Sequence, residues 1–325
     1  MICLGIEGTA HTFGVAIVDE NKNILADLRD GYTNEKGGII PQDAAKHHHN
    51  VADKLINDAL KQAKITFRDI DLISFSRSPG LAPCLLVVKE KAKYLALEHK
   101  KNVIGVNHCI AHLSSGLFWT KTRDPIYIFT SGANTQIIAL EGNRFRIFGE
   151  TLDIGLGNAL DKFGRGIGLG FPSGPKIEEL SEKGKYIQLP YTVKGMDLAF
   201  SGIVTEAINK HKKGASKEDL CYSMQETCFA MLAEVVERAL AHTQKRECVV
   251  IGGVAANRRL LEMLNIMCNE RKARFFAVPL KYAGDNAVNI AWQGILEFKR
   301  GRKNEIKTLD INPNERVDDV DVFWT

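Results

Sequence analysis

The apolar residues of this chain fall into short runs separated by glycine-rich or polar turns. The first runs are Ile2–Glu7, Phe13–Val18 and Ile24–Leu28, and their length and composition are typical of β-strands. Gly8–Thr12 joins the first two runs, so we predict a β-hairpin with a tip of small residues. The segment Pro41–Ala63 is predicted to be a helix, because a proline suits the first turn.

The pattern then alternates between strands and helices. Leu72–Phe75 is a predicted strand, followed after a tight turn by a helix that ends near Leu97. Val103–Val106 is the next strand, and the helix after it carries His108 and His112. The order of three strands, helix, strand, helix, strand and helix is the plan of one lobe of the actin-like fold.

A second series of runs begins after Asp124-Pro125, the predicted hinge. Ile126–Thr130, Thr135–Leu140 and Arg144–Thr151 repeat the three strands, and Ser131–Asn134 repeats the small-residue tip. This recurrence indicates an internal duplication. We therefore predict an α/β protein with the bilobal actin-like fold of sugar kinases, heat-shock ATPases and actin. Its duplicated ribonuclease H-like lobes would span residues 1–123 and 124–325, the second with a helical insertion.

The two hairpin tips suggest nucleotide binding. Small residues let backbone N–H groups approach a phosphate closely. Either hairpin alone could be an ordinary turn, but two facing tips would make a cleft for an adenylate or ATP-type nucleotide.

Composition narrows the classes of protein that remain. The formal net charge is +4, which permits nucleic-acid binding without arguing for it. Seven scattered cysteines without a Cys-x-x-Cys motif indicate reduced thiols and a cytoplasmic protein, or also a nuclear one in a eukaryote. No apolar run reaches the ~18 residues of a membrane span, and no basic segment precedes the first strand, so we expect neither a membrane protein nor a signal peptide.

A histidine pair is the first candidate for chemistry. His108 and His112 lie four residues apart on a predicted helix and therefore share a face, as two metal ligands would. Alone, such a pair is more often a packed or solvated helix face. Asp285 lies near the start of the last predicted helix, where it is either a cap or a third ligand.

Other polar residues flank glycines. Asn257 follows Gly252-Gly253 after a predicted strand, a suitable corner for an adenosine. Asp161 and Glu178 could bind ribose hydroxyls, or they could be surface carboxylates. We assign no general base, and three consecutive histidines at 47–49 are expected at the surface.

Several motifs, taken together, resemble one family along nearly the whole chain. They are Gly5-Ile6-Glu7-Gly8-Thr9-Ala10, Gly105-Val106-Asn107-His108-Cys109-Ile110-Ala111-His112, Phe148-Gly149-Glu150-Thr151-Leu152-Asp153, Lys194-Gly195-Met196-Asp197, Phe200-Ser201-Gly202, Gly252-Gly253-Val254-Ala255-Ala256-Asn257 and Gly284-Asp285-Asn286. In this order they resemble the tRNA threonylcarbamoyladenosine transferases, formerly described as O-sialoglycoprotein endopeptidases. The chain is most similar to the archaeal and eukaryotic branch, the catalytic subunit of the KEOPS complex.

The resemblance implies an activity and partners. The reaction would transfer a threonylcarbamoyl group from threonylcarbamoyl-adenylate to N6 of the adenosine beside the anticodon of ANN-decoding tRNAs. The implied partners are tRNA and the KEOPS subunits, a small atypical protein kinase and small accessory or dimerisation subunits. Lys89–Lys93 and Lys210–Lys213 could meet the tRNA backbone, or they could be solvated helix faces.

The resemblance also implies the site. One divalent metal per subunit, iron or zinc, would be held by His108, His112 and Asp285. Ser131 and Asp161 are the expected catalytic residues. The expected substrate-binding residues are Phe129, Thr130, Ser131, Gly132, Ala133, Asp161, Gly174, Glu178 and Asn257.

The chain departs from the family pattern at several positions. Where the family has a metal-binding tyrosine, this chain has Phe129, and Ala133 replaces a glycine. The family's Gln-Gly-Pro-Gly reads Arg77-Ser78-Pro79-Gly80, and Ile40 replaces a histidine. A nucleotide-binding scaffold with reduced activity is therefore one alternative, and another actin-like phosphotransferase is a second. A peptidase is disfavoured, because the histidine pair lacks the glutamate of the HExxH motif.

Overall fold

The computed structural model describes residues 1–33, 38–132 and 134–324, and its contacts divide the chain into two units. Unit 1 comprises Met1–Phe118 and Asp285–Thr325, and unit 2 comprises Trp119–Gly284. The sequence instead placed everything after residue 123 in the second lobe. The packing differs from that expectation because the last long helix, α10 (Ala287–Lys299), lies on the first sheet.

The sheet of unit 1 has the strand order β3-β2-β1-β4-β5. β1 to β3 are antiparallel neighbours, whereas β4 and β5 run parallel to β1. The central strands are buried along nearly their whole length, as expected for a sheet covered on both faces. The elements of this unit before α10 are β1 (Ile2–Glu7), β2 (Thr12–Asp19), β3 (Ile24–Gly31), α1 (Pro41–Ala63), β4 (Leu72–Ser78), α2 (Ala82–His99), β5 (Asn102–Asn107) and α3 (His108–Trp119).

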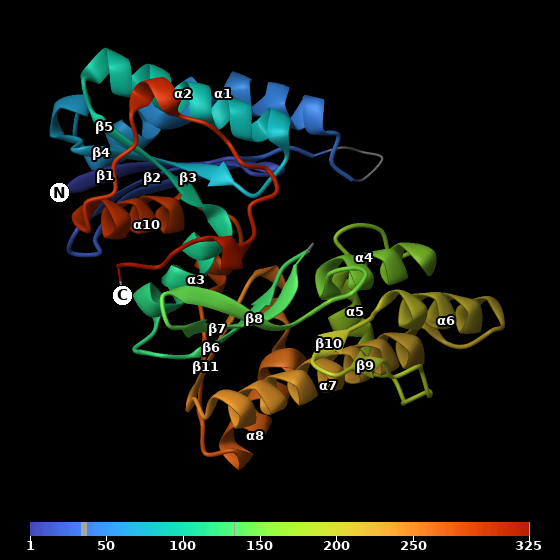
Figure 1. Cartoon of the computed structure of the whole chain (residues 1–325). Coiled ribbons are helices and arrows are strands. Elements are labelled where there is room, and N and C mark those ends of the chain that lie inside the picture. Colours follow the sequence, from blue (N-terminus) through green and yellow to red (C-terminus); the bar gives the residue numbers. More distant parts are fainter. Residues whose placement is uncertain (34–37, 133, 325) are drawn as a thin grey trace. The chain divides into compact units, whose positions relative to one another are not determined.

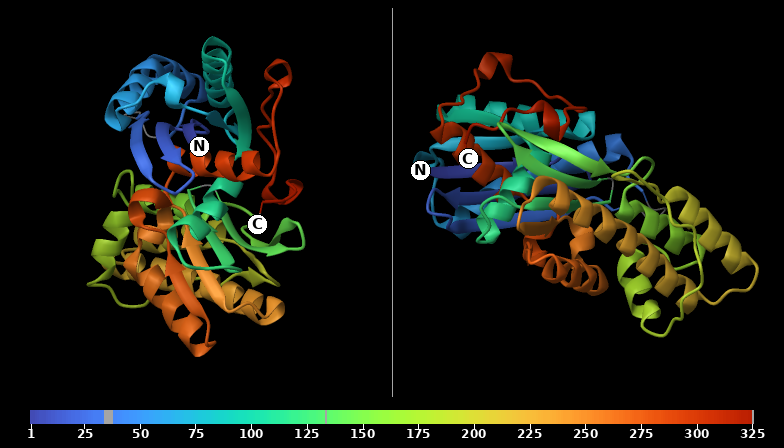
Figure 2. Two further views of the ribbon diagram at one scale, coloured as in Figure 1. Left: turned by 90° about the vertical axis from the view of Figure 1, so that its left-hand side faces the viewer. Right: turned by 60° about the horizontal axis from the view of Figure 1, so that its bottom comes forward.

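Helices cover both faces of this sheet. α1 and α2 pack together on one face, and α10 lies on the other, against β1 and β4 (Figure 1). α1 begins at Pro41 and ends at Ala63, as predicted. The segment after α10, at the red end of the colour scale, runs beside β5 and α2 along the edge of the unit (Figure 2).

Unit 2 repeats the same topology with additional helices. Its sheet has the order β12-β11-β6-β7-β8, again three antiparallel strands continued by two parallel ones. The predicted duplication is therefore confirmed. The elements of this unit are β6 (Ile126–Thr130), β7 (Thr135–Glu141), β8 (Arg144–Glu150), α4 (Leu156–Gly166), α5 (Gly174–Ser181), β9 (Val193–Lys194), β10 (Asp197–Leu198), α6 (Ser201–Lys212), α7 (Lys217–Thr243), β11 (Glu247–Ile251), α8 (Arg258–Glu270), β12 (Arg274–Ala277) and α9 (Leu280–Ala283).

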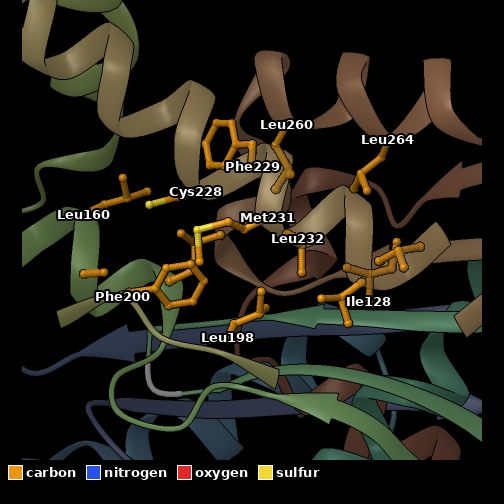
Figure 3. Close-up of a cluster of buried hydrophobic side chains, with 14 of the residues drawn as sticks. Ile128, Leu160, Leu198, Phe200, Cys228, Phe229, Met231, Leu232, Leu260 and Leu264 are labelled. Atoms are coloured by element: carbon orange, nitrogen blue, oxygen red, sulfur yellow. The ribbon is translucent and has the colours of Figure 1, made fainter. Parts of the chain in front are cut away.

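The core of unit 2 forms between its sheet and the inserted helices. Apolar side chains of α7 and α8 point toward those of the β10–α6 segment and of β6 (Figure 3). Phe200, Phe229 and Leu232 are fully buried there. Because burying one such side chain is worth ~1.5–3 kcal/mol, this cluster anchors the insertion to the sheet.

The starts of two helices bear on the candidate site. α5 begins at Gly174, with Pro175 in its first turn. The cap of α10 is Asn286, whose side chain accepts a hydrogen bond from the Asn289 N–H, so Asp285 is not the cap. Within the described residues, no helix combines the length and apolar composition that crossing a lipid bilayer requires.

Candidate metal and nucleotide sites

Three ligand-type side chains meet in unit 1 at the start of α3 and just before α10. The Nε2 atoms of His108 and His112 lie 3.4 Å and 3.5 Å from Oδ1 of Asp285. One ligand atom from each residue falls within 4.8 Å of the others. The two imidazoles are buried, and the Asp285 side chain is 26% exposed. Two nitrogens and one oxygen at this spacing fit a divalent metal that keeps a position open.

Glu7 contacts the ring nitrogen of His108 that faces away from Asp285. It lies at the end of β1, has no exposed surface, and its Oε2 is 3.0 Å from Nδ1 of His108. The Thr9 N–H and hydroxyl both donate to Oε1, at 2.8 Å and 2.6 Å. A carboxylate bound to the far nitrogen of a histidine fixes the ring and directs its other nitrogen to a metal.

The charges of the cluster favour a cation. Burial favours neutral imidazole, but the charges of Glu7 and Asp285 raise the pKa of His108 well above its ordinary value. Burial and the charge on His108 lower the pKa of His112. Burial alone would raise the pKa of Asp285, but hydrogen bonds to both histidines bring it well below the usual range. The carboxylates of Glu7 and Asp285 thus supply the negative charge that a bound cation would neutralise.

Replacing Glu7 with glutamine tests this support. Glu7→Gln keeps the size of the side chain but removes the negative charge behind His108, and loss of such an outer partner typically weakens metal binding by ~10- to 100-fold. We expect that loss in calorimetric titration of metal-free protein with Zn²⁺. Glu20→Gln is the control, at a half-buried carboxylate of the same unit that pairs with the N-terminal ammonium. Equal affinity of the Glu7 and Glu20 variants would show that the contact with His108 does not act on the metal.

The first hairpin tip is held by contacts with neighbouring elements. The Gly8 N–H donates to Oγ of Ser76, and the Leu81 N–H donates to the Thr9 carbonyl. His48 of α1 is fully buried, with Nε2 3.0 Å from the Ala10 carbonyl oxygen. The three histidines at 47–49 were predicted to lie at the surface, which is wrong for His48.

His48 should remain neutral at physiological pH. Burial and the neighbouring His47 lower its pKa to about 4, against the smaller opposing effects of the Ala10 carbonyl and Glu7, while His11 also lowers it. As the pH falls, the His48 ring therefore takes up a proton in the unfolded chain before it does so in the folded one. This preference lowers the free energy of unfolding progressively between pH ~6.5 and about 4. NMR titration of the ring should report this low pKa, and His48→Gln should flatten the fall in stability. A measured pKa of 6.5 or above would contradict it.

The candidate nucleotide residues of unit 2 lie around the carboxyl ends of β6 and β11. The Asn158 N–H donates to the Gly132 carbonyl at 3.0 Å, which joins the second hairpin tip to α4. Gly252 follows β11 with φ +101°, and a Cβ there would lie 2.2 Å from the Thr130 carbonyl oxygen. Ligands of open α/β sheets bind at such strand ends, where the topology switches direction.

The three polar residues that the sequence predicted to bind the nucleotide, Asp161, Glu178 and Asn257, form hydrogen bonds within the protein. Asp161 Oδ1 accepts a hydrogen bond from the Ser173 N–H at 2.7 Å, next to Gly174. Glu178 Oε1 accepts from the Arg258 N–H and Nε, at 2.9 Å and 3.1 Å. Asn257 caps α8 through the Leu260 N–H, and its amide donates to Gln225. These bonds link α4, α5 and α8.

Three further predicted residues lie on or beside β6. Phe129 and Thr130 are buried in the strand, and the phenyl ring of Phe129 offers no ligand atom. The Ser131 hydroxyl accepts a hydrogen bond from the Asn134 N–H. Ala133 lies outside the described residues.

Two contacts of the histidine cluster were not predicted from the sequence. Glu7 could have been suspected, because a carboxylate ends an otherwise apolar strand. Asn107 directly precedes His108 and is the N-cap of α3. Asparagine is a preferred residue at this position, so its role could have been predicted.

Comparisons with known proteins place this geometry in context. The family described as TsaD, tRNA N6-adenosine threonylcarbamoyltransferase, matches residues 23–292. A protein of that name from Thermococcus sibiricus is 54% identical over the full length of both chains, and one from Archaeoglobus fulgidus is 48% identical over the same extent. A probable bifunctional tRNA threonylcarbamoyladenosine biosynthesis protein of Methanobrevibacter smithii is 51% identical, and the match covers all of this chain and 60% of that protein.

Solved structures give the fold. Full-length HypF in its phosphate- and nucleotide-bound form matches 91% of this chain and 55% of its own with a TM-score of 0.63 at 12% identity. A ROK family glucokinase from Streptomyces griseus matches 91% of this chain and 99% of its own with a TM-score of 0.53 at 13% identity. At these identities the likeness shows the fold alone, and the predicted actin-like fold is confirmed.

Proposed function

Because the chain belongs to the tRNA N6-adenosine threonylcarbamoyltransferase family, we propose that it transfers a threonylcarbamoyl group to N6 of an adenosine in tRNA. The protein is a transferase that acts on tRNA. The donor we propose is threonylcarbamoyl-adenylate, and the target is the adenosine beside the anticodon of ANN-decoding tRNAs. Such a base is unpaired and can be turned into a pocket.

The observation that carries this proposal is the buried cluster of His108, His112 and Asp285 with its support from Glu7. A scaffold would have no need of two desolvated imidazoles and a carboxylate aimed at one point. The same donor set disfavours a phosphotransferase that uses Mg²⁺ alone, since that ion prefers oxygen ligands.

We propose one divalent metal per chain at this cluster, iron or zinc. Imidazole and carboxylate ligands suit both ions. When bound, the ion would act as a Lewis acid toward a carbonyl or phosphoryl oxygen of the donor. The chain's own residues hold it, with Glu7 fixing the orientation of His108.

The adenylate site that we propose lies in unit 2. Ser131 and Gly132 would present the hairpin tip to the phosphate, and Gly174, at the start of α5, leaves open space beside its Cα. One carboxylate oxygen of Asp161 binds Ser173, and the other accepts no hydrogen bond within the described chain, so it is available to a ribose hydroxyl. Glu178 and Asn257 would shape the same pocket from α5 and α8.

The partners that we propose are tRNA and the KEOPS subunits, including a small atypical kinase. The longer, bifunctional relative supports a second protein module acting with the transferase. In the basic run on α2, Lys91 pairs with Asp53 at 2.7 Å and Lys89 with Glu90 at 3.1 Å. Lys212 and Lys213 are exposed and remain candidates for the tRNA backbone. Seven free cysteines support a cytoplasmic location.

The test is reconstitution of the reaction. Metal-loaded protein is incubated with threonylcarbamoyl-adenylate and an ANN-decoding tRNA transcript, with and without the partner subunits, and the nucleosides are analysed by mass spectrometry. We expect threonylcarbamoyladenosine, and none from a transcript with guanosine at the target position. No product under any condition, with tRNA and nucleotide both bound, would favour the scaffold.

A further inference from the structure

The C-terminal tail, residues 300–324, is attached to unit 1 beside the predicted metal cluster. The Asn312 N–H donates to the Arg77 carbonyl at 3.0 Å, and the Gly80 N–H donates to the Pro313 carbonyl at 3.1 Å. Asn304 accepts a hydrogen bond from the Gly105 N–H at 2.9 Å. The tail therefore crosses the ends of β4 and β5, the strand that leads into α3.

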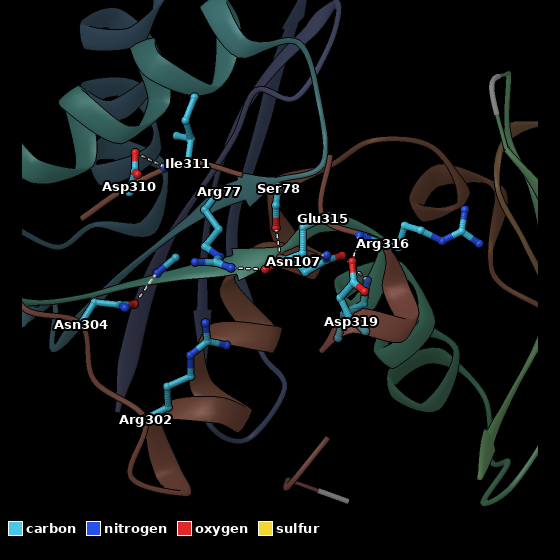
Figure 4. A network of polar contacts seen from close by, with 12 residues as sticks. Arg77, Ser78, Asn107, Arg302, Asn304, Asp310, Ile311, Glu315, Arg316 and Asp319 are labelled. Carbon is cyan, nitrogen blue, oxygen red and sulfur yellow. Dashed lines mark hydrogen bonds and ion pairs between the residues drawn. The ribbon is translucent and has the colours of Figure 1, made fainter. Parts of the chain in front are cut away.

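Glu315 is the central side chain of this attachment. Arg77 and Ser78 of β4 both bind its carboxylate, and the Asn107 amide donates to Oε2 at 3.1 Å (Figure 4). The Glu315 side chain is only 10% exposed, and Asn107 is 2% exposed. Hydrogen bonds to a charged, poorly solvated carboxylate are among the stronger ones in proteins.

Asn107 connects this carboxylate to the histidine helix. While its amide nitrogen donates to Glu315, its Oδ1 accepts from the Ile110 N–H at 3.1 Å, the bond of a helix N-cap. His108 is the first residue of α3, and His112 lies one turn further. The orientation of one amide thus depends on the tail and sets the start of the helix that carries both imidazoles.

We propose that Glu315 is a positioning residue for the metal ligands, acting through Asn107 on the first turn of α3. This inference rests on the proposed metal site. Arg77 and Ser78 supply two of the three donors to Glu315.

The experiment compares Co²⁺ binding by the wild type and by Glu315→Gln, using calorimetry and the visible absorption bands of the ion. We expect a loss of ~10-fold in affinity, the lower end of the effect of an outer partner, together with altered bands. Asp310→Asn is the matched control, because that tail carboxylate accepts a hydrogen bond from the adjacent Ile311 N–H and, within the described residues, binds no other group (Figure 4). It should bind Co²⁺ within twofold of the wild type.

A double-mutant cycle separates positioning from general loosening of the tail. With Asn107→Ala already in place, Glu315→Gln should cause little further loss of affinity. A full additional tenfold loss in that background, or no loss in the wild-type background, would overturn the proposal.

A second readout needs no metal. Hydrogen exchange of the Ile110 amide should be faster in Glu315→Gln than in Asp310→Asn, because its cap is less well oriented. Absence of Co²⁺ binding by the wild type would count against the proposed metal site alone. Unchanged Ile110 exchange would count against the role of Glu315.

Discussion

Replacing His108 or His112 with alanine is expected to reduce metal affinity by more than ~100-fold, beyond the effect of losing an outer partner. Among the residues that the structure describes, each histidine supplies one of the three ligand-type atoms that meet at the cluster. Threonylcarbamoyl transfer should fall in proportion, measured as modified nucleoside formed per minute. His108→Ala should also lower stability, because it leaves the fully buried Glu7 carboxylate without its imidazole partner.

His99→Ala is the control for this prediction. His99 lies at the end of α2 in the same unit, where its ring stacks on Phe67 at 3.9 Å between centroids. Its removal should leave metal affinity and transfer unchanged. Retention of wild-type affinity by His112→Ala, the variant that leaves Glu7 paired, would rule out this cluster as the metal site.

A single methyl group at Gly5 should disturb both the fold and the site. An added Cβ would lie 2.5 Å from the Ala287 carbonyl oxygen and 2.7 Å from the Ala291 nitrogen, so α10 cannot stay in place. Overpacking of this kind costs ~1–3 kcal/mol or more. Asp285 directly precedes Asn286, the N-cap of α10, so we expect Gly5→Ala to weaken metal binding as well as to lower the denaturant midpoint.

Gly31→Ala is the matched control for Gly5→Ala. Gly31 ends β3 in the same sheet, and a Cβ there meets no atom within 4 Å. This variant should be as stable as the wild type or slightly more so. If Gly5→Ala matched it in both stability and metal affinity, the close packing of α10 on β1 would not position Asp285.

Much of the fold could be predicted because its signals are local. Short apolar runs, glycine turns and the proline of α1 mark individual elements, and repetition of the three-strand pattern revealed the duplication. The packing of α10 on the first sheet could not be predicted from such local signals. It depends on the fit between Gly5 and Ala291, which are almost the whole chain apart.

The candidate site was predicted unevenly for the same reason. His108 and His112 share a helix face, so their spacing indicated a ligand pair. Asp285 could be a cap or a ligand by its position, and the choice of ligand needed the family resemblance. Glu7 contacts His108, which is 101 positions away in the sequence. Glu315 contacts Asn107, which is 208 positions away. Glu7 ends an apolar strand and could have been suspected for that reason, whereas nothing in the local sequence of Glu315 distinguishes it from an ordinary surface carboxylate.

The most direct test of the metal-dependent transferase is titration of metal-free protein with ferrous or zinc ion while the modified nucleoside is measured. Threonylcarbamoyl-adenylate and an ANN-decoding tRNA are supplied throughout, with the partner subunits. We expect product formation to rise with added metal, to level at one ion per chain, and to be lost in His112→Ala. Full product formation by the metal-free protein, or an unchanged titration with His112→Ala, would contradict the assignment of the site.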